Sequence, residues 1–328
     1  MDCCRASSRH GAPRLHWLSI QPEVEIFISL PAQTLELFQG GDLLHRYAVS
    51  TAKNGAGEQS GSYRTPRGKH LIRAKIGGNS PENTVFVKRR PTGEVWTEEL
   101  AEQFPGRDWM LTRLLWLSGL EPGFNRLGNV DTMRRYIYLH GSPDIARMGE
   151  PGSIGCVRMQ NRDIVELFGL VPPYTRVNIC DYRIEVCDWS AAIERARPVR
   201  MKVFVEEQGV PLSLEWDEFD AGSRHALALD AKGKESGTGR LLPDGHIGRM
   251  AVLPEWRGKG VGAALLRRLM EVAGKSGMRR VLLNAQTQAA DFYARYGFTP
   301  EGDEFIEAGI PHITMAQTLN GNKHSLQS

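Results

Sequence analysis

The feature that most constrains the fold of this chain is a change of sequence pattern near Asp181. Before it, short alternating or wholly apolar runs such as VEIFISL, LHRYAVST and YIYLHG are separated by Gly, Pro and Asn. Runs of this kind predict several short strands joined by turns. After it, helix-like and strand-like segments alternate, which is typical of an α/β unit. We therefore expect a mostly-β domain followed by an α/β domain.

The length agrees with two domains, because 328 residues exceed one ordinary domain. We place a tail at 1–22, the mostly-β domain at 23–182, the α/β domain at 183–320 and a second tail at 321–328. No flexible linker is visible at the boundary, so the two domains can pack directly against each other.

Several helices are expected within these domains. In the first, TEELAEQF near Thr97 and NRDIVELFGL look helical, with Asn161 or Asp163 as the N-cap of the second segment. In the second domain we expect a helix with a proline interruption within 188–208 and a long helix near Val261.

Composition excludes several classes of protein. Hydrophobic residues make up 41% and charged residues 24% of the chain, which are globular values. The net charge of +3 and the lack of basic runs interleaved with aromatics argue against nucleic-acid binding. No apolar run is long enough to span a bilayer. The first residues lack the apolar core of a secretory signal, so we expect a cytoplasmic protein.

The cysteines fit the same compartment. Five cysteines form no even disulfide framework, which fits a reducing environment. Cys3 and Cys4 are adjacent, and adjacent cysteines rarely pair with each other. Cys187 is expected to be a small buried residue. No CxxC or HExxH spacing exists, so we expect no metal site.

Cys156, in the segment GSIGCVRMQNRD, is a candidate nucleophile. A catalytic cysteine needs a base and donors aimed at an oxyanion. His140 ends an apolar run, where its imidazole can face a cleft, and Gly155 permits a turn that presents backbone N–H groups. Arg158 would share a strand face with Cys156, bind a substrate carboxylate and lower the pKa of the thiol. From these residues alone a structural thiol is the commoner alternative.

Three segments in order resemble the YkuD-type L,D-transpeptidase catalytic domain. They are TPRG at Thr65–Gly68, the HG that begins at His140, and SIGCVRM around Cys156, followed by a helix that Asp163 opens. The resemblance covers roughly half of the chain and implies a β-sandwich or barrel. It implies a peptidoglycan stem peptide or muropeptide as substrate, whose carbonyl before the terminal D-residue Cys156 attacks to form a thioester.

The same resemblance implies roles for the neighbouring residues. His140 would be the base, with its second ring nitrogen held by a backbone carbonyl near Gly141. Backbone N–H groups of Gly155 and Cys156 would bind the oxyanion. Ser153 and Arg158 would contact the substrate. Water as acceptor gives L,D-carboxypeptidase action, and an amine gives transpeptidation.

Two departures from the family pattern stand out. Ile154 stands where many members carry a polar residue, often His, which bears on acceptor choice and thiolate stabilisation. A long insertion from about Gly77 to Met133, rich in Trp and Arg, could form a lid or a larger subsite wall. Trp96, Trp109 and Trp116 could line a glycan groove, although core packing is the commoner use of such residues.

A glycine-rich turn carries the second chemistry. The run IGRMAVLPEWRGKGVGAALLRRLM predicts a strand, a turn and a helix. Free N–H groups at the helix start favour a pyrophosphate, and Arg257 and Lys259 add positive charge. The spacing is not the G-x-G-x-x-G of a Rossmann fold, and no acidic ribose partner stands in the expected place.

The R-x-x-G-x-G spacing and the FYxxxGF ending of AADFYARYGF resemble the GCN5-related N-acetyltransferases (GNAT). VFVEEQGVP and EFIEAGIPHITM are similar to the ElaA-like branch of that family. The resemblance spans about Ile184 to Leu319 and implies acetyl-CoA as cofactor, with Tyr293 as the acid that protonates the leaving thiolate. The implied cofactor-binding residues are Met250, Ala251, Val252, Arg257, Gly258, Lys259, Gly260, Val261 and Gly262.

Alternatives stay open for the residues around this site. Tyr293 can equally be a packed aromatic on its helix. Glu215, Asp217 and His312 are candidates for deprotonating an amine, but surface or structural roles are commoner for such residues.

Together the two halves predict a bifunctional acyltransferase. CoA thioesters are cytoplasmic, so the first domain would act there on soluble muropeptides, and the second would acetylate an unknown amine. In one alternative, the first domain is a non-catalytic module that binds cell-wall peptides. In the other, the protein is an exported wall-modifying toxin.

Overall fold

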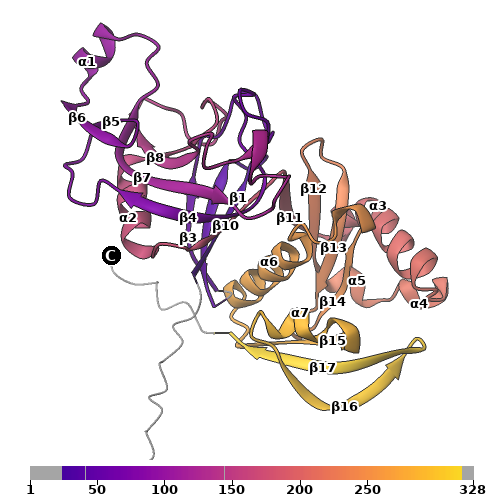
Figure 1. Ribbon diagram of the computed structural model, residues 1–328. Coiled ribbons are helices and arrows are strands. Elements are labelled where there is room, and N and C mark those ends of the chain that lie inside the picture. The colour runs from indigo at the N-terminus through magenta and orange to yellow at the C-terminus, as the bar shows by residue number, and fades with distance from the viewer. Residues whose placement is uncertain (1–23, 41, 144, 320–328) are drawn as a thin grey trace, which may run out of the picture.

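A computed structural model describes residues 24–40, 42–143 and 145–319 and shows two lobes (Figure 1). The N-terminal lobe, indigo to magenta, is mostly β, and the C-terminal lobe, orange to yellow, combines helices with sheets. Both expected fold classes are therefore confirmed. The predicted tails, with Cys3 and Cys4, lie outside the described residues.

One mixed sheet forms the N-terminal lobe, and ten of the described strands take part in it. They are β1 (Val24–Ser29), β2 (Thr34–Gln39), β3 (Asp42–Ala48), β4 (Gly68–Ile76), β5 (Thr84–Val87), β6 (Arg90–Val95), β7 (Met110–Gly119), β8 (Tyr138–Ser142), β9 (Val157–Gln160) and β10 (Arg176–Cys180). The main path is β3-β2-β1-β10-β4-β7-β5-β6, and β8 joins β7 to β9. The pairs β1–β10 and β8–β9 are parallel.

Helix α2 (Asn161–Leu170) packs its buried Ile164 and Leu167 into the core of this sheet. The helix begins at Asn161 with Gln160 as its N-cap, so neither Asn161 nor Asp163 is the cap that we expected. The reason is that the Asn161 side chain is engaged elsewhere. It accepts a hydrogen bond from Thr112 Oγ1 at 2.7 Å and donates one to Asn83 Oδ1 at 2.6 Å.

The segment from Gly77 to Met133 is only partly the insertion that we expected. Its first part forms the β5–β6 hairpin and helix α1 (Glu98–Gln103), which projects from the lobe (Figure 1). Its second part forms β7, which pairs with β4, β5 and β8. The short 3₁₀ turn η1 (Gly128–Val130) follows β7. Because Leu111, Leu114 and Leu115 of β7 are wholly buried, this strand belongs to the core of the lobe.

The C-terminal lobe contains two smaller antiparallel sheets. The first has the order β11 (Tyr182–Asp188), β12 (Arg224–Asp230), β13 (Glu235–Leu241) and β14 (Ile247–Val252). The second has the order β15 (Arg280–Gln286), β17 (Ile310–Thr318) and β16 (Thr299–Glu307). The helices are α3 (Trp189–Arg200), the π-helix η2 (Met201–Glu207), α4 (Leu212–Glu215), α5 (Phe219–Gly222), η3 (Pro254–Trp256), α6 (Val261–Lys275), η4 (Thr287–Ala289) and α7 (Ala290–Ala294).

The helices follow the expected pattern with one difference. The long helix near Val261 is α6, which buries a stripe of apolar residues including Leu265 and Leu269. Pro198 does not end α3, because it lies in the last turn and the chain continues as η2. No helix of the described residues is both long and apolar enough to cross a membrane.

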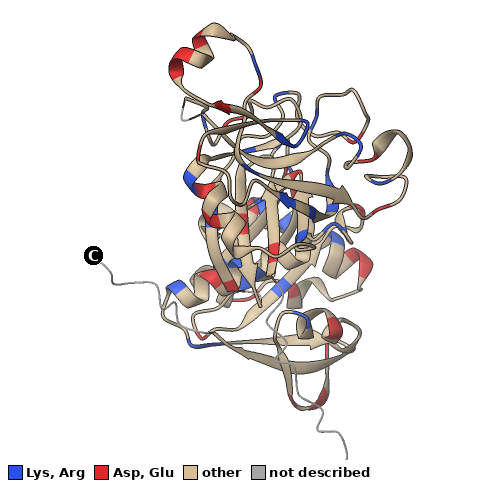
Figure 2. Cartoon of the chain, turned by 60° about the vertical axis from the view of Figure 1, so that its left-hand side comes forward, with Lys and Arg blue, Asp and Glu red and all other residues tan. Residues whose placement is uncertain are grey.

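The two lobes share an apolar core. Only Asp181 separates β10 from β11, so no linker intervenes. Phe27 and Phe38 of the N-terminal sheet belong to the same buried cluster as Leu265 and Leu266 of α6. Figure 2 shows basic and acidic residues interspersed over both lobes.

Candidate active sites

Cys156 lies one residue before β9, beside the strand that carries His140. In the parallel β8–β9 pair, His140 is opposite Arg158. Since side chains alternate along a strand, Cys156, Arg158 and His140 belong to one face, and Cys156 packs against the cluster that includes Tyr138. The structure therefore places the thiol, the imidazole and the guanidinium that the sequence singles out on one face of the sheet.

His140 has the protonation state of a base. Its Nδ1 lies 2.7 Å from the carbonyl oxygen of Gly141, as the family resemblance implies. Because a carbonyl only accepts, Nδ1 carries the proton and Nε2 has the free lone pair. Burial lowers the pKa of His140, and its buried Nε2 has no hydrogen-bond partner among the described residues. A neutral imidazole of this kind can accept a proton from a thiol.

Cys156 is a protonated thiol at neutral pH. Burial raises the pKa of its thiol to about 12, and this outweighs the lowering by Arg158 and Arg135. Arg158 does lower the pKa of the thiol, as we expected, but desolvation is the larger cause and the net pKa is raised. The sulfur donates at 3.6 Å to the carbonyl of Tyr136. Such a thiol needs a base to become a nucleophile.

Arg158 is already paired with a carboxylate. One guanidinium nitrogen lies 2.5 Å from Oδ1 of Asp108, and another donates at 3.1 Å to the carbonyl of Gly152. Asp108 precedes β7 and lines the cavity in front of Cys156. A substrate carboxylate at Arg158 would therefore compete with Asp108.

The loop before Cys156 is held by internal hydrogen bonds. The Ser153 hydroxyl is buried, donates to the Cys156 carbonyl at 2.6 Å and accepts from the Gly155 N–H at 3.2 Å. Ser153 therefore shapes the loop and is not among the residues that line the cavity in front of Cys156, and the Gly155 N–H is already engaged. The TPRG segment supports the same loop, because Thr65 Oγ1 accepts from the Ala52 N–H and donates to the Gly155 carbonyl, both at 3.0 Å.

A cavity of about 580 Å³ opens in front of Cys156. Arg89 reaches it from the β5–β6 turn, where its guanidinium lies 4.4 Å from the ring centre of Trp116 and 4.9 Å from that of Tyr136. Trp116 thus supports an arginine, and Trp109 is buried in a core cluster beside Trp96. The charged residues that line the cavity are Lys88, Arg89, Arg134, Arg135 and Asp108, so the cavity wall is mainly basic.

The second site lies where β14 meets α6. Arg249 and Met250 of β14 lie opposite Gly239 of β13, so the ladder is bulged there, and Arg249 has a φ of 51°. Gly258 (φ 74°) and Gly260 (φ 86°) then turn the chain into α6. No side chain caps the start of α6, whose first N–H groups therefore remain available. This loop fits a pyrophosphate, which is the anion that the resemblance implies.

The two basic residues of this loop are engaged by the protein. Arg257 makes a two-pronged ion pair with Glu207 at 2.7 and 2.6 Å, and its Nε donates to the Val252 carbonyl at 3.0 Å. Lys259 Nζ lies 5.0 Å from the ring centre of Trp256. Arg257 therefore ties the loop to η2 and β14, and the backbone is the main candidate for binding phosphate.

A second cavity, of about 500 Å³, lies between β14 and the β15–β17 sheet. Met250, Tyr293 and His312 line it, with Glu307 and Asn284 on the opposite strands. Burial raises the pKa of Tyr293 to about 12, so its hydroxyl keeps its proton at neutral pH. A protonated hydroxyl on this wall has the state required of an acid.

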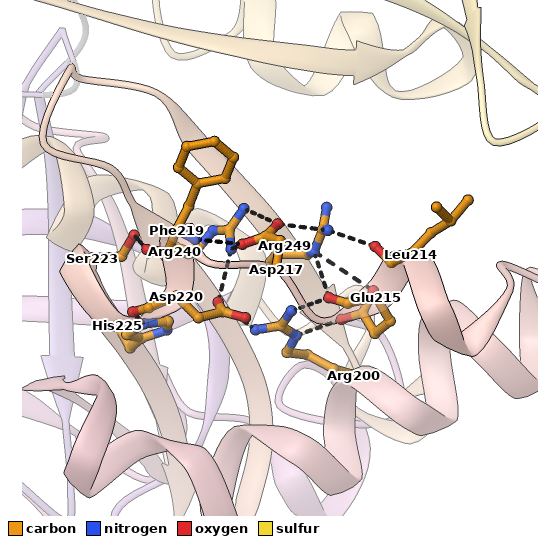
Figure 3. Close-up of polar contacts among 10 residues, drawn as sticks. All are labelled: Arg200, Leu214, Glu215, Asp217, Phe219, Asp220, Ser223, His225, Arg240 and Arg249. Carbon is orange, nitrogen blue, oxygen red and sulfur yellow. Dashed lines mark hydrogen bonds and ion pairs between the residues drawn. The ribbon is translucent and has the colours of Figure 1, made fainter.

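The candidate bases Glu215 and Asp217 belong to an ion-pair network (Figure 3). Arg200 is buried and pairs with Glu215 and with Asp220, the latter at 2.8 Å. Arg240 bridges Asp217 at 2.6 Å and Asp220 at 2.8 Å. Glu215 and Asp217 are thus both engaged in ion pairs. Glu215 still lines the cavity, as does His312, whose Nδ1 contacts the Ile310 carbonyl.

Arg249 anchors this network to the β14 bulge. Its guanidinium donates to the carbonyls of Leu214 (3.0 Å) and Glu215 (3.2 Å) and to Asp217 at 3.0 Å. These contacts hold a non-glycine residue in the left-handed region at the cavity wall.

Four charged residues that shape these two sites were not identified from the sequence: Asp108, Arg200, Arg240 and Arg249. No local pattern points to Asp108, because its partner Arg158 lies 50 positions further along the chain. Arg200 carried a usable signal, a charged residue within the apolar stretch PVRMKVFV. Cys187 packs beside Leu227 and Trp189 but is only partly buried, whereas we expected a buried residue.

Comparisons with known proteins match the two lobes separately. The family described as "L,D-transpeptidase catalytic domain" (YkuD) matches residues 23–179, and "Acetyltransferase (GNAT) domain" matches residues 192–319. The "Uncharacterized N-acetyltransferase YjcF" of Bacillus subtilis (strain 168) is 40% identical over 36% of this chain and 86% of that protein. The "Uncharacterized protein YyaT" of the same organism is 35% identical over 40% of this chain and 93% of its own length. The crystal structure of Escherichia coli ElaA is 28% identical and covers 41% of this chain and 99% of that one, with a TM-score of 0.38.

Proposed function

This chain belongs to the GNAT acetyltransferases through its C-terminal half and carries a YkuD-type L,D-transpeptidase catalytic domain in its N-terminal half, and from this premise we propose that it is a bifunctional acyltransferase. The N-terminal domain would cleave peptidoglycan stem peptides through a thioester on Cys156. The C-terminal domain would acetylate an amine with acetyl-CoA. The observation that carries the first activity is the buried, neutral His140 with its unpaired Nε2 on the face shared with Cys156.

In the first reaction His140 Nε2 takes the proton of the Cys156 thiol, and the sulfur attacks the substrate carbonyl. The C–N bond to the terminal D-residue breaks, and the leaving amine receives the proton from His140. Water or an amine then attacks the thioester, and its proton returns through His140 to the sulfur. The basic cavity wall fits the carboxylates of a stem peptide. Of the two expected oxyanion donors, the Gly155 N–H already donates to Ser153. The Cys156 N–H is therefore the donor in this proposal.

In the second reaction acetyl-CoA supplies an acetyl group activated as a thioester. The backbone of residues 258–262 would hold its pyrophosphate, and the strand end at Met250, Ala251 and Val252 would hold the acetyl arm. Arg257 would position this loop through Glu207 and Val252. Tyr293 would hold a proton at its hydroxyl until the thiolate leaves.

One experiment tests the first activity. The purified full chain is incubated with a tetrapeptide stem, and loss of one D-Ala is followed by mass. Wild type should trim the peptide and Cys156→Ala should not. No trimming by wild type, or equal trimming by Cys156→Ala, would refute the proposal. Parallel reactions with acetyl-CoA and a panel of amines, with Tyr293→Phe as the variant, test the second activity.

A second candidate function for the N-terminal domain is binding of cell-wall peptides without turnover. The specific observation in its favour is the thiol pKa of about 12, beside Ile154 in place of a polar residue. Iodoacetamide distinguishes the two, because a catalytic Cys156 should be alkylated faster in the presence of His140 than in His140→Ala. Equal slow alkylation in both proteins would favour the binding module.

A further inference from the structure

The phosphate-binding loop of the GNAT half touches the other lobe of the molecule. We propose that Asn178 of β10 and Tyr182, which begins β11 and packs on Phe27 of β1, position this loop, so that acetyl-CoA binding depends on contact with the L,D-transpeptidase half. Both residues lie outside the range matched to the GNAT family. The inference rests on the proposed use of acetyl-CoA. It makes the fusion of the two domains a requirement of the cofactor site.

The contacts centre on Gly260. A Cβ atom added to Gly260 would lie 3.0 Å from Nδ2 of Asn178 and 3.1 Å from the hydroxyl oxygen of Tyr182. Asn178 belongs to β10, which pairs with β1 and β4 inside the N-terminal sheet. The Tyr182 hydroxyl also donates at 3.3 Å to the carbonyl of Lys259. Two side chains from the domain junction therefore close over the turn that leads into α6.

Tyr182 transmits this contact from one lobe to the other. It is buried, and its ring packs at 5.7 Å from that of Phe27 in β1 and at 6.3 Å, edge on, from that of Trp256. Trp256 in turn lies under the ammonium group of Lys259. A packed path thus runs from the first strand of the N-terminal sheet to the loop.

The helix behind the loop is fixed to the same sheet. Arg267 of α6 pairs with Glu25 of β1, and Arg268 pairs with Glu36 of β2 at 2.8 Å. Arg46 of β3 reaches Glu271 of α6 at 3.0 Å. Together with the shared core at Phe38, these pairs leave α6 little freedom to move relative to the N-terminal sheet.

Fixing the loop before the ligand arrives lowers the entropy lost on binding. Gly260 needs this help, because its φ of 86° is one of many conformations open to a glycine. Asn178 also contributes an uncharged amide beside Gly260, in the loop that would hold the pyrophosphate. A carboxylate there would repel the ligand, and salt would screen the repulsion.

The test is direct binding of acetyl-CoA to the full chain by isothermal titration calorimetry. Asn178→Asp should raise the Kd about tenfold in low salt and much less in about 1 M salt, where the Debye length is ~3 Å. Asn178→Ser removes the amide without adding charge and should show a smaller loss that does not depend on salt. Saturating acetyl-CoA should restore the kcat of acetyl transfer in both variants, because both changes act on binding of the cofactor and not on the transfer step.

Tyr182→Phe keeps the ring and removes one hydrogen bond, and Tyr47→Phe is its matched control. Tyr47 is a buried tyrosine whose hydroxyl donates at 2.8 Å to Glu166, in the N-terminal lobe. Tyr182→Phe should weaken acetyl-CoA binding about threefold to tenfold, the range of one hydrogen bond, and should reduce the rise in Tm caused by the ligand. Tyr47→Phe should change neither quantity.

The outcomes separate this inference from the proposed function. A wild-type chain that binds neither acetyl-CoA nor CoA overturns the proposed acetyl transfer and the inference with it. A wild-type chain that binds, with folded Asn178→Asp and Tyr182→Phe variants that bind equally well, overturns the inference alone. If Asn178→Asp does not fold, the comparison of Tyr182→Phe with Tyr47→Phe decides.

Discussion

At the scale of single residues, Asp108 controls the charge around Cys156. It holds Arg158 at 2.5 Å. Burial raises the pKa of the Cys156 thiol and Asp108 adds to this rise, whereas burial lowers the pKa of His140 and Asp108 opposes this lowering. Asp108→Asn removes a negative charge beside the thiol and frees the guanidinium of Arg158. We expect Cys156 to be alkylated by iodoacetamide several-fold faster at pH 8, with the pH profile displaced to lower pH.

The control for this prediction is Asp163→Asn, which removes a carboxylate from the first turn of α2. Its carboxylate lies beside Arg162 and is not among the groups that shift the Cys156 pKa most. It should leave the alkylation rate unchanged. A rate for Asp108→Asn that equals wild type at every pH would contradict the assigned role of Asp108.

At the same scale, His70 makes the N-terminal lobe sensitive to acid. Its ring is fully buried in β4 between the Gly68 carbonyl (2.9 Å) and Thr132 Oγ1 (3.1 Å), and burial lowers its pKa to about 4. As the pH falls below about 6.5, the unfolded chain binds a proton that the folded chain refuses until about pH 4. His70 therefore lowers the free energy of unfolding by about 2 kcal/mol as the pH falls from 6.5 to 5.

Urea denaturation at pH 7 and pH 5 measures this effect. His70→Asn retains a side chain that can hydrogen bond and does not titrate, so its stability should fall less than that of wild type between the two pH values. The buried His140 acts in the same direction, so some acid sensitivity should remain. An identical fall in wild type and His70→Asn would contradict the prediction.

At the scale of elements, the ion-pair network fixes α3, α4 and α5 to β13 and β14 (Figure 3). Arg200 is 1% exposed and faces two buried carboxylates, those of Glu215 and Asp220. Arg200→Met would remove the nearest partner of Glu215 and leave Asp220 paired with Arg240. Breaking a buried pair in this way costs about 3–5 kcal/mol. We expect the free energy of unfolding to fall by that amount.

A matched arginine on the same helix provides the control. The side chain of Arg197 is 49% exposed, and its ion pair with Glu194 is 3.9 Å long. Arg197→Met should change the free energy of unfolding by less than about 1 kcal/mol, the usual limit for exposed pairs. Equal losses in the two variants, measured by urea denaturation, would show that the network is not what holds these helices.

At the scale of the whole molecule, the sequence predicts what is local and misses what the fold brings together. The two fold classes, the strand with His140 and the loop with Cys156 follow from periodicity and from short motifs. The pairing of Arg158 with Asp108 does not, and neither does the closure of Asn178 over Gly260, because each joins segments distant in sequence. The raised pKa of Cys156 is of the same kind, since desolvation depends on every neighbour in space.

The shared core also predicts how the molecule unfolds. Phe38 of β2 is 5% exposed, belongs to the same cluster as Leu265 and Leu266 of α6, and has the guanidinium of Arg267 4.5 Å from its ring centre. Because this cluster crosses the domain boundary, we expect one cooperative transition for both lobes in scanning calorimetry. Phe38→Ala should cost about 3–5 kcal/mol and split the transition into two.

Phe86→Ala distinguishes loss of the interface from loss of any core residue. Phe86 is 1% exposed and packs with Leu114 and Tyr138 inside the N-terminal lobe, away from α6. Its removal creates a cavity of similar size, so it should lower the Tm without separating the lobes. Two transitions in wild type would mean that the lobes fold independently. A single lowered transition in Phe38→Ala would mean that the remaining contacts, at Phe27 and in the ion pairs of α6, are enough to couple them. Because ligand binding stabilises whatever unfolds with the binding site, acetyl-CoA should raise the Tm of both lobes in wild type and of the C-terminal lobe alone in Phe38→Ala.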